Sequence, residues 1–284
     1  MLILKNSELT IDLIDPASDQ IHLGPRFCWG GYIWQVKDNK LGPLMSGPEW
    51  PKAFPDPFNG QGLPESFRYK TRDNKFLTWN GSTGVSLGAG ELGILKDGTC
   101  GVTKPCKWII TGMKFGIKFQ TRHTLLGYDY EIIREITLID RSIRSKTTLI
   151  NYDKNTLSLE WFAHPFFALK KGLITAELPQ GTTLPHNSSF NLTGSVLNQT
   201  RVFQSMTDGH LDYLTLPKDN TTITKVNHPV LDSVEFSFNF VPSECLIWGN
   251  NATFSIEPYK IITLKPHESQ SWMLEYKFGR PTSV

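Results

Sequence analysis

Apolar and polar residues alternate over several stretches of this chain, and this period of two constrains the fold more than any other feature. Between residues 233 and 240 every second residue is Val or Phe, and the residues between them are Ser, Glu or Asn. The same alternation recurs over residues 272–278 and 117–120. Successive side chains of a β-strand point to opposite faces, so each stretch predicts a strand with one buried and one polar face.

The stretch 128–164 contains neither Gly nor Pro, and its length alone would suit a helix. Residues 130–139, however, are rich in β-branched Ile and Thr, which favour strands. After a polar interruption at 140–145, two further extended runs follow at 146–151 and 157–162. We interpret the whole stretch as successive antiparallel strands with short connections.

These patterns predict an all-β fold, a sandwich of large antiparallel sheets with few or no helices. A length of 284 residues fits one such sandwich, because all-β folds often use this length as a single domain. No composition shift or repeat marks a boundary, so we expect one domain over residues 1–284. The Pro-rich stretch 42–64 is predicted to be a long ordered loop, a place where binding groups often lie.

Charge and cysteine content narrow the classes of partner. The chain has 29 basic and 27 acidic residues and a formal charge of +2, which argues against nucleic acid and against a membrane surface. No run approaches the ~20 apolar residues of a membrane span, and residues 1–10 lack the pattern of a signal peptide. We therefore expect a cytoplasmic protein with reduced cysteines, Cys28 and Cys245 in the core and Cys100 and Cys106 as ordinary thiols. No Cys/His spacing indicates a metal site.

Two short segments carry side chains suited to acid–base chemistry. His164 stands where a predicted strand meets a proline, and Glu257 is predicted to end a strand just before Pro258. Burial raises the pKa of a carboxyl group and a nearby carboxylate keeps an imidazole protonated, so such a pair can exchange protons near neutral pH. Taken singly, His164 has a plainer interpretation as a structural histidine, and Glu257 as an edge-strand carboxylate.

At these residues the chain resembles the galactose mutarotase-like superfamily, which includes aldose 1-epimerases and hexose-6-phosphate mutarotases. His-Pro-Phe-Phe at His164 is similar to the segment that carries the family's acid. Ser-Ile-Glu-Pro-Tyr at Glu257 is similar to the strand that carries its base. The similarity extends over residues 130–169 and 246–278.

The resemblance implies a β-supersandwich with a sugar cleft on the concave face of its larger sheet. It also implies mutarotation, in which Glu257 takes the proton of the anomeric hydroxyl while His164 protonates the ring oxygen. The ring opens, the carbonyl turns over, and reclosure gives the other anomer. The resemblance thus implies a small-molecule sugar as partner. It implies no cofactor and no metal, because each step is a proton transfer that two side chains can perform.

The sugar-holding residues are less clear, because the family's Asn-Arg pair and second histidine are missing here. The candidates are Glu91, Gln61, Glu65, Arg26, Arg68, Arg72 and Trp248. Taken singly, the arginines are ordinary surface charges and most tryptophans are core residues. A carboxylate such as Glu91 in the cleft suits a neutral sugar, whereas an arginine there suits a hexose phosphate. Since no arginine pair is evident, the sequence favours a neutral sugar.

Three classes of function therefore remain open. The first is an aldose 1-epimerase-like isomerase, with a hexose-6-phosphate mutarotase as its variant. The second is a non-catalytic carbohydrate-binding protein that keeps the cleft. The third and weakest is a sandwich domain of a polysaccharide lyase or hydrolase.

Overall fold

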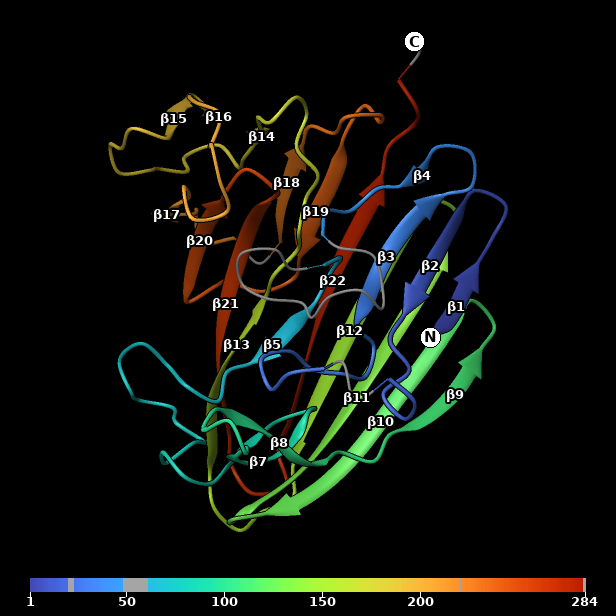
Figure 1. Cartoon of the computed structure of the whole chain (residues 1–284), viewed down its shortest axis with the longest axis vertical. Coiled ribbons are helices and arrows are strands. Elements are labelled where there is room, and N and C mark those ends of the chain that lie inside the picture. The colour runs from blue at the N-terminus through green and yellow to red at the C-terminus, as the bar shows by residue number, and fades with distance from the viewer. Residues whose placement is uncertain (20–22, 48–60, 220, 283–284) are drawn as a thin grey trace.

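The computed structural model describes residues 1–19, 23–47, 61–219 and 221–282, and these residues form β-strands joined by turns and loops, with no helix among them (Figure 1). The predicted all-β class is confirmed. No helix of the described part is long and apolar enough to cross a membrane.

The strands form four sheets, and all registered neighbours are antiparallel. The largest sheet has ten strands in the spatial order β15 (Phe190–Thr193), β16 (Val196–Gln199), β14 (Thr175–Glu177), β18 (Thr222–Val226), β19 (Val234–Phe238), β22 (Ser269–Phe278), β12 (Ser142–Asn151), β11 (Tyr128–Ile139), β10 (Gly116–Leu125) and β9 (Ile109–Met113). The second sheet has the order β17 (His210–Leu214), β20 (Glu244–Gly249), β21 (Phe254–Leu264), β13 (Leu157–Ala163) and β5 (Glu65–Phe67).

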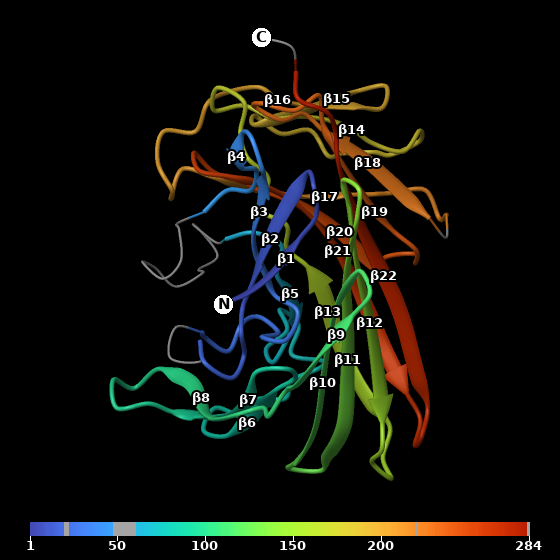
Figure 2. The ribbon, with the colours of Figure 1, turned by 90° about the vertical axis from the view of Figure 1, so that its right-hand side faces the viewer.

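Two smaller sheets come from the N-terminal part of the chain. One consists of β1 (Leu2–Lys5), β2 (Leu9–Leu13), β3 (Ile33–Asp38) and β4 (Gly42–Pro43). The other consists of β6 (Gly84–Ser86), β7 (Gly90–Ile94) and β8 (Cys100–Pro105). Figure 2 shows both on the same side of the ten-stranded sheet, with the β6–β8 sheet toward its lower end.

The three alternating stretches coincide with β19, β22 and β10, except that β19 ends at Phe238. Their alternating apolar residues are buried as expected, apart from half-buried Ile117. The polar interruption at 140–145 is shorter than predicted, because only residues 140 and 141 form the turn and β12 begins at Ser142. Ile143 faces the core and Arg144 faces solvent, so the alternation of β12 already starts within that polar run. Of the predicted loop 42–64, residues 48–60 lie outside the described residues.

The main core joins buried residues of the ten-stranded sheet with those of the five-stranded sheet and of the sheet β1–β4. The rings of Trp161 and Trp272, one from each sheet, lie 5.1 Å apart, and Phe236 stacks on Tyr276 at 4.8 Å. The four cysteines are free thiols, with Cys28 and Cys245 buried as predicted. Apolar residues of β13 and β21 face this core. The other faces of these two strands are turned toward the two small N-terminal sheets and the described loops that join them, here called the N-terminal layer.

Candidate active site

His164 and Glu257 lie side by side on the face of the five-stranded sheet that is covered by the N-terminal layer. His164 directly follows β13, and Glu257 belongs to the neighbouring strand β21. The imidazole Nε2 is 3.5 Å from carboxylate Oε1 of Glu257. The structure therefore brings together the two residues that the sequence singled out for acid–base chemistry.

The predicted strand end at Glu257 is wrong, since β21 continues through Pro258 to Leu264. The pairing of β13 with β21 ends at Phe162 and Tyr259, so no β13 residue is registered opposite Pro258. On the other side Pro258 is registered opposite Cys245 of β20, but the backbone of the next residue, Tyr259, bonds toward β20 at Ser243. The missing N–H of Pro258 therefore points to the β13 side, where the pairing has ended, and the strand tolerates it.

Ser255, Glu257 and Tyr259 lie on the same face of β21, because alternate side chains of a strand share one face. The hydroxyl of Ser255 lies 3.1 Å from Nδ1 of His164, and the hydroxyl of Tyr259 donates to Oε2 of Glu257 at 3.1 Å. Both ring nitrogens and both carboxylate oxygens thus have a neighbour. Ser255 and Tyr259 were not predicted from the sequence, although their spacing of two from Glu257 is a signal that could have found them.

Aromatic side chains enclose the imidazole. Only 2% of His164 and 4% of Glu257 is exposed. Phe166 stacks on the His164 ring with centroids 4.2 Å apart, while Phe27 and Trp248 present their edges at 6.1 and 5.8 Å. Trp248, a predicted sugar-stacking residue, is therefore at the site, where it packs against the histidine.

This burial governs the protonation of the couple. It raises the pKa of Glu257 to about 7, against the opposing effect of the positive charge on Arg26. It also lowers the pKa of His164 well below its usual value, and the charge of Arg26 lowers it further. Desolvation disfavours the charged form of both groups, so burial acts against the expected protonation of the imidazole by the nearby carboxylate. Burial therefore favours the neutral imidazole of His164, and the pKa of the Glu257 carboxyl group lies near neutral pH.

A pH-dependent stability follows from Glu257. Its folded-state pKa of about 7 lies above its ordinary value of 4.5, so the folded protein binds the extra proton between these values. Stability conferred by this group is therefore lost as pH rises from 4.5 to 7, by up to about 3 kcal/mol. We expect Glu257→Gln to become progressively more stable than the wild type over this range in urea denaturation. Parallel stability curves for the two proteins at pH 5, 6, 7 and 8 would contradict the assignment, since His164 is present in both.

The three candidate arginines gather around the same carboxylate. The guanidinium of Arg26 lies over the rings of Phe27 and Phe162 at 5.5 and 5.7 Å. Arg68 pairs with Glu160 at 2.6 Å, and Arg72 donates to the hydroxyl of Tyr213. The charges of all three arginines favour the ionised form of Glu257.

A cavity of about 360 Å³ is bordered by Phe162 and Arg26, two neighbours of the couple, although neither His164 nor Glu257 is among its described lining residues. Its described lining residues are Arg26, Ser66, Arg68, Tyr69, Lys70 and Phe162. Phe162 also stacks on Tyr259 at 4.7 Å, which connects this wall to the hydroxyl that binds Glu257. The cavity wall therefore contains three basic side chains and no carboxylate among the residues described. Lys70 and Ser66 were not predicted.

The other predicted sugar-holding residues lie elsewhere. Glu91 pairs with Lys104 at 2.7 Å, and the side-chain amide of buried Gln61 makes no hydrogen bond to the described part of the chain. Glu65 forms a buried ion pair with Arg134. No hydrogen bond, ion pair or ring contact within the described residues joins any of these three to His164 or Glu257.

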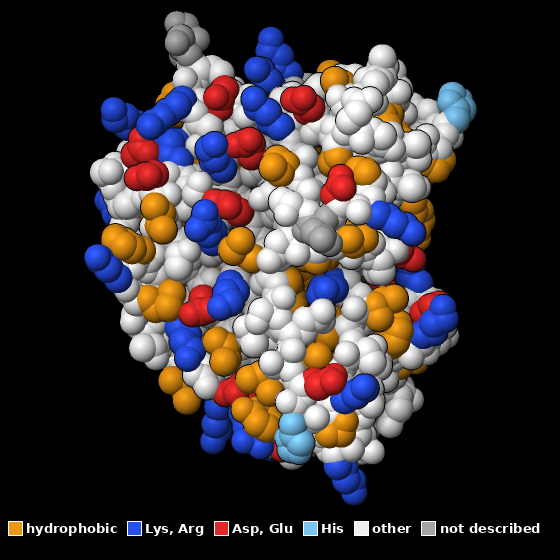
Figure 3. Space-filling model, turned by 180° about the vertical axis from the view of Figure 1, so that it is seen from behind, with side chains coloured by type: hydrophobic (Ala, Val, Ile, Leu, Met, Phe, Trp, Pro, Cys, Tyr) orange, Lys and Arg blue, Asp and Glu red, His pale blue; other side chains and the backbone are white. Residues whose placement is uncertain are grey.

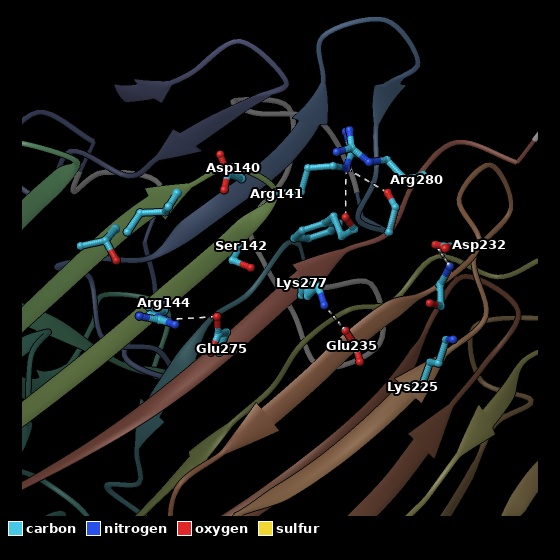
Figure 4. A pocket seen from close by; sticks show the side chains of 15 residues that line it. Asp140, Arg141, Ser142, Arg144, Lys225, Asp232, Glu235, Glu275, Lys277 and Arg280 are labelled. Carbon is cyan, nitrogen blue, oxygen red and sulfur yellow. Dashed lines mark hydrogen bonds and ion pairs between the residues drawn. The ribbon is translucent and has the colours of Figure 1, made fainter.

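Another cavity, of about 690 Å³, lies on the outer face of the ten-stranded sheet (Figure 4). Its charges are interleaved and paired, as Arg144 with Glu275 and Lys277 with Glu235. Figure 3 shows the same mixture of positive and negative side chains over this outer side of the molecule. Such pairing is typical of a solvated sheet face, so we do not place the active site there. No cluster of His, Cys, Asp and Glu able to hold a metal ion occurs within the described residues.

Comparison with known proteins relates the fold to one group of solved structures. No protein-family model and no curated protein matches the chain. A galactose mutarotase-like protein from Lactobacillus casei superposes with a TM-score of 0.64 at 13% identity, covering 98% of this chain and 99% of its own. A galactose mutarotase related enzyme from Lactobacillus acidophilus gives 0.64 at 14% identity, covering 100% and 99%. An aldose epimerase homologue from C. elegans gives 0.58 at 13% identity, covering 99% of each chain. The chain therefore has the galactose mutarotase-like fold.

Proposed function

We propose that this protein interconverts the α and β anomers of a sugar, with His164 and Glu257 as the proton-transferring residues. The observation that carries the proposal is the distance of 3.5 Å between Nε2 and Oε1 of these two buried side chains. The ring oxygen and the anomeric hydroxyl oxygen of a sugar are bonded to the same carbon. Two groups this close together can therefore reach both oxygens at once.

The reaction needs one proton in the couple at each stage. With the couple's proton on the imidazole, the arrangement that burial disfavours and a bound sugar would have to stabilise, the carboxylate of Glu257 removes the proton of the anomeric hydroxyl. His164 donates its proton to the ring oxygen, the bond from this oxygen to the anomeric carbon breaks, and a carbonyl forms. Rotation of the carbonyl and the reverse transfers close the ring as the other anomer. Ser255 and Tyr259 keep the two groups oriented through the hydrogen bonds at Nδ1 and Oε2.

A phosphorylated hexose is the substrate variant that the cavity favours. The sequence favoured a neutral sugar, but Arg26, Arg68 and Lys70 line the space beside the couple, whereas Glu91 pairs with Lys104 elsewhere. A phosphate group accepts charge-assisted hydrogen bonds from such cations, and arginine is well suited to bind it with two parallel bonds.

The test is polarimetry on freshly dissolved α-anomers of glucose and galactose and of their 6-phosphates, with binding measured by calorimetry. We expect faster anomer exchange with the full-length protein than without it, and phosphates binding at least tenfold more tightly, about 1.4 kcal/mol. Binding with no change in exchange rate would support the non-catalytic carbohydrate-binding alternative instead.

Arg68→Met tests the contribution of the cationic wall. We expect it to weaken binding of the 6-phosphates about tenfold or more and to leave binding of the neutral sugars nearly unchanged. Arg144→Met is a matched control, because Arg144 also pairs with a glutamate but lies on the outer face of the ten-stranded sheet. Equal losses for both classes of sugar would contradict the phosphate assignment.

A further inference from the structure

A separate cavity of about 640 Å³ lies where the end of β8 and the segment after it meet β10. Four of its described lining residues are basic, Lys104, Lys107, Arg122 and His123, and none is acidic. This differs from the larger cavity in Figure 4, whose wall contains carboxylates beside its cations. A volume of this size is within the range of about 300–1,000 Å³ typical of small-molecule sites.

The carboxylates that neutralise this cluster are outside the described lining. Glu91 pairs with Lys104 at 2.7 Å, and Asp129 receives two hydrogen bonds from Arg122 at 3.1 and 3.0 Å. Lys107 has no ion pair to any residue that the structure describes. Lys107 is therefore the one lysine or arginine of the described wall whose charge is not balanced by a described carboxylate.

Two ring nitrogens of lining residues lack hydrogen-bond partners. Nε1 of Trp108 and Nε2 of His123 are both buried without one among the described residues. Oε1 of Glu91 lies 3.7 Å from Nε2 of His123, which is too long for a hydrogen bond. A buried polar group left without a partner costs about 1–3 kcal/mol. An acceptor bound within reach of either nitrogen would remove this cost.

We infer that this cavity binds an oxyanion, the phosphate or carboxylate group of a small metabolite. Lys107 and Arg122 supply the charge, and the Trp108 indole N–H, with the His123 ring in its Nε2–H tautomer, supplies neutral donors. An oxyanion offers several acceptor lone pairs. One such group can therefore accept hydrogen bonds both from the segment after β8 and from β10. The inference does not rest on the proposed mutarotation, because the two sites share no lining residue.

The test follows the indole N–H resonance of Trp108 in ¹H–¹⁵N spectra of the full-length protein, assigned by its loss in Trp108→Phe. Inorganic phosphate, glucose 6-phosphate, glucuronate and glucose are titrated separately. We expect saturable shifts of this resonance with phosphate, with glucuronate or with both, and none with glucose. The response to phosphate against glucuronate identifies which oxyanion the site prefers.

Lys107→Met is expected to raise the Kd of the active anion about tenfold, whereas Lys114→Met, an exposed lysine outside the cavity, is expected to leave it unchanged. Thermal unfolding of both variants checks that each remains folded. The inference is overturned if no anion shifts the Trp108 resonance, if glucose shifts it equally, or if Lys107→Met has no effect. Loss of phosphate binding only in Arg68→Met would also overturn it, since the anion would then occupy the cavity beside Glu257.

Discussion

Glu257→Gln is expected to reduce the rate of anomer exchange by about 10²–10⁴-fold, the usual contribution of one general acid–base group. The amide keeps the size of the side chain and still accepts a hydrogen bond from Tyr259, but it cannot take up a proton. His164→Asn is expected to lose as much, and the double variant little more than either, because the two residues act as one unit. The rate is measured by polarimetry with the sugar in large excess over the protein, and sugar binding is measured by calorimetry.

Glu177→Gln serves as the control for this prediction, because Glu177 is an exposed carboxylate on β14 of the other sheet. Its exchange rate should equal that of the wild type. If both Glu257→Gln and His164→Asn exchange anomers at the wild-type rate, the mechanism is wrong. Loss of binding in either variant would show that the residue holds the sugar and does not only transfer protons.

The second large effect concerns the buried ion pair of Glu65 and Arg134. Both side chains are within 2% of complete burial, and Ser145 and Thr147 donate to the same carboxylate at 2.6 and 3.1 Å. Arg134 also donates to the carbonyl of Gly30 at 3.0 Å. Removing one partner leaves a buried charge uncompensated, so Arg134→Met is expected to lower the free energy of unfolding by about 3–5 kcal/mol.

Glu65→Gln combined with Arg134→Met should recover part of that loss, because no uncompensated charge then remains. Urea denaturation of the two single variants and the double variant measures the coupling. Additive losses would indicate that the two side chains stabilise the fold independently. Lys146→Met is a suitable control, since Lys146 pairs with Glu135 at 3.2 Å on the exposed face of the same strands and should change stability by less than about 1 kcal/mol.

Much of the fold could be predicted from the sequence, because the alternation of apolar and polar residues in a strand is visible within a short stretch of sequence. The alternation at residues 233–240 and 272–278 gave strands with the correct buried face, since a period of two has only one such solution once one face is apolar. The start of β12 was missed because Arg144 and Ser145 are polar on both faces. Ser145 points inward only because Arg134 and Glu65 bind it, a contact between residues far apart in the sequence.

The candidate site was predictable in part for the same reason. His164 and Glu257 stood out through their short flanking segments, but their protonation depends on burial by Phe27, Phe166 and Trp248, which no local pattern reveals. The partners of Glu91, Gln61 and Glu65 likewise depend on the pairing of distant strands. Ser255 and Tyr259 were within reach, because residues two positions either side of a strand residue share its face.

That shared face of β21 has a consequence for how the sequence can vary. Inserting or deleting one residue within the first half of β21 would exchange the two faces of the strand, presenting Ile256 or Pro258 to His164 and turning Glu257 toward the apolar interior. Ser255, Glu257 and Tyr259 would all turn away from the face that carries His164, and the Glu257 carboxylate would enter the core without a partner. Length changes in natural or engineered relatives should therefore accumulate in the turn at residues 250–253 and spare residues 255–259, where only substitutions can be tolerated.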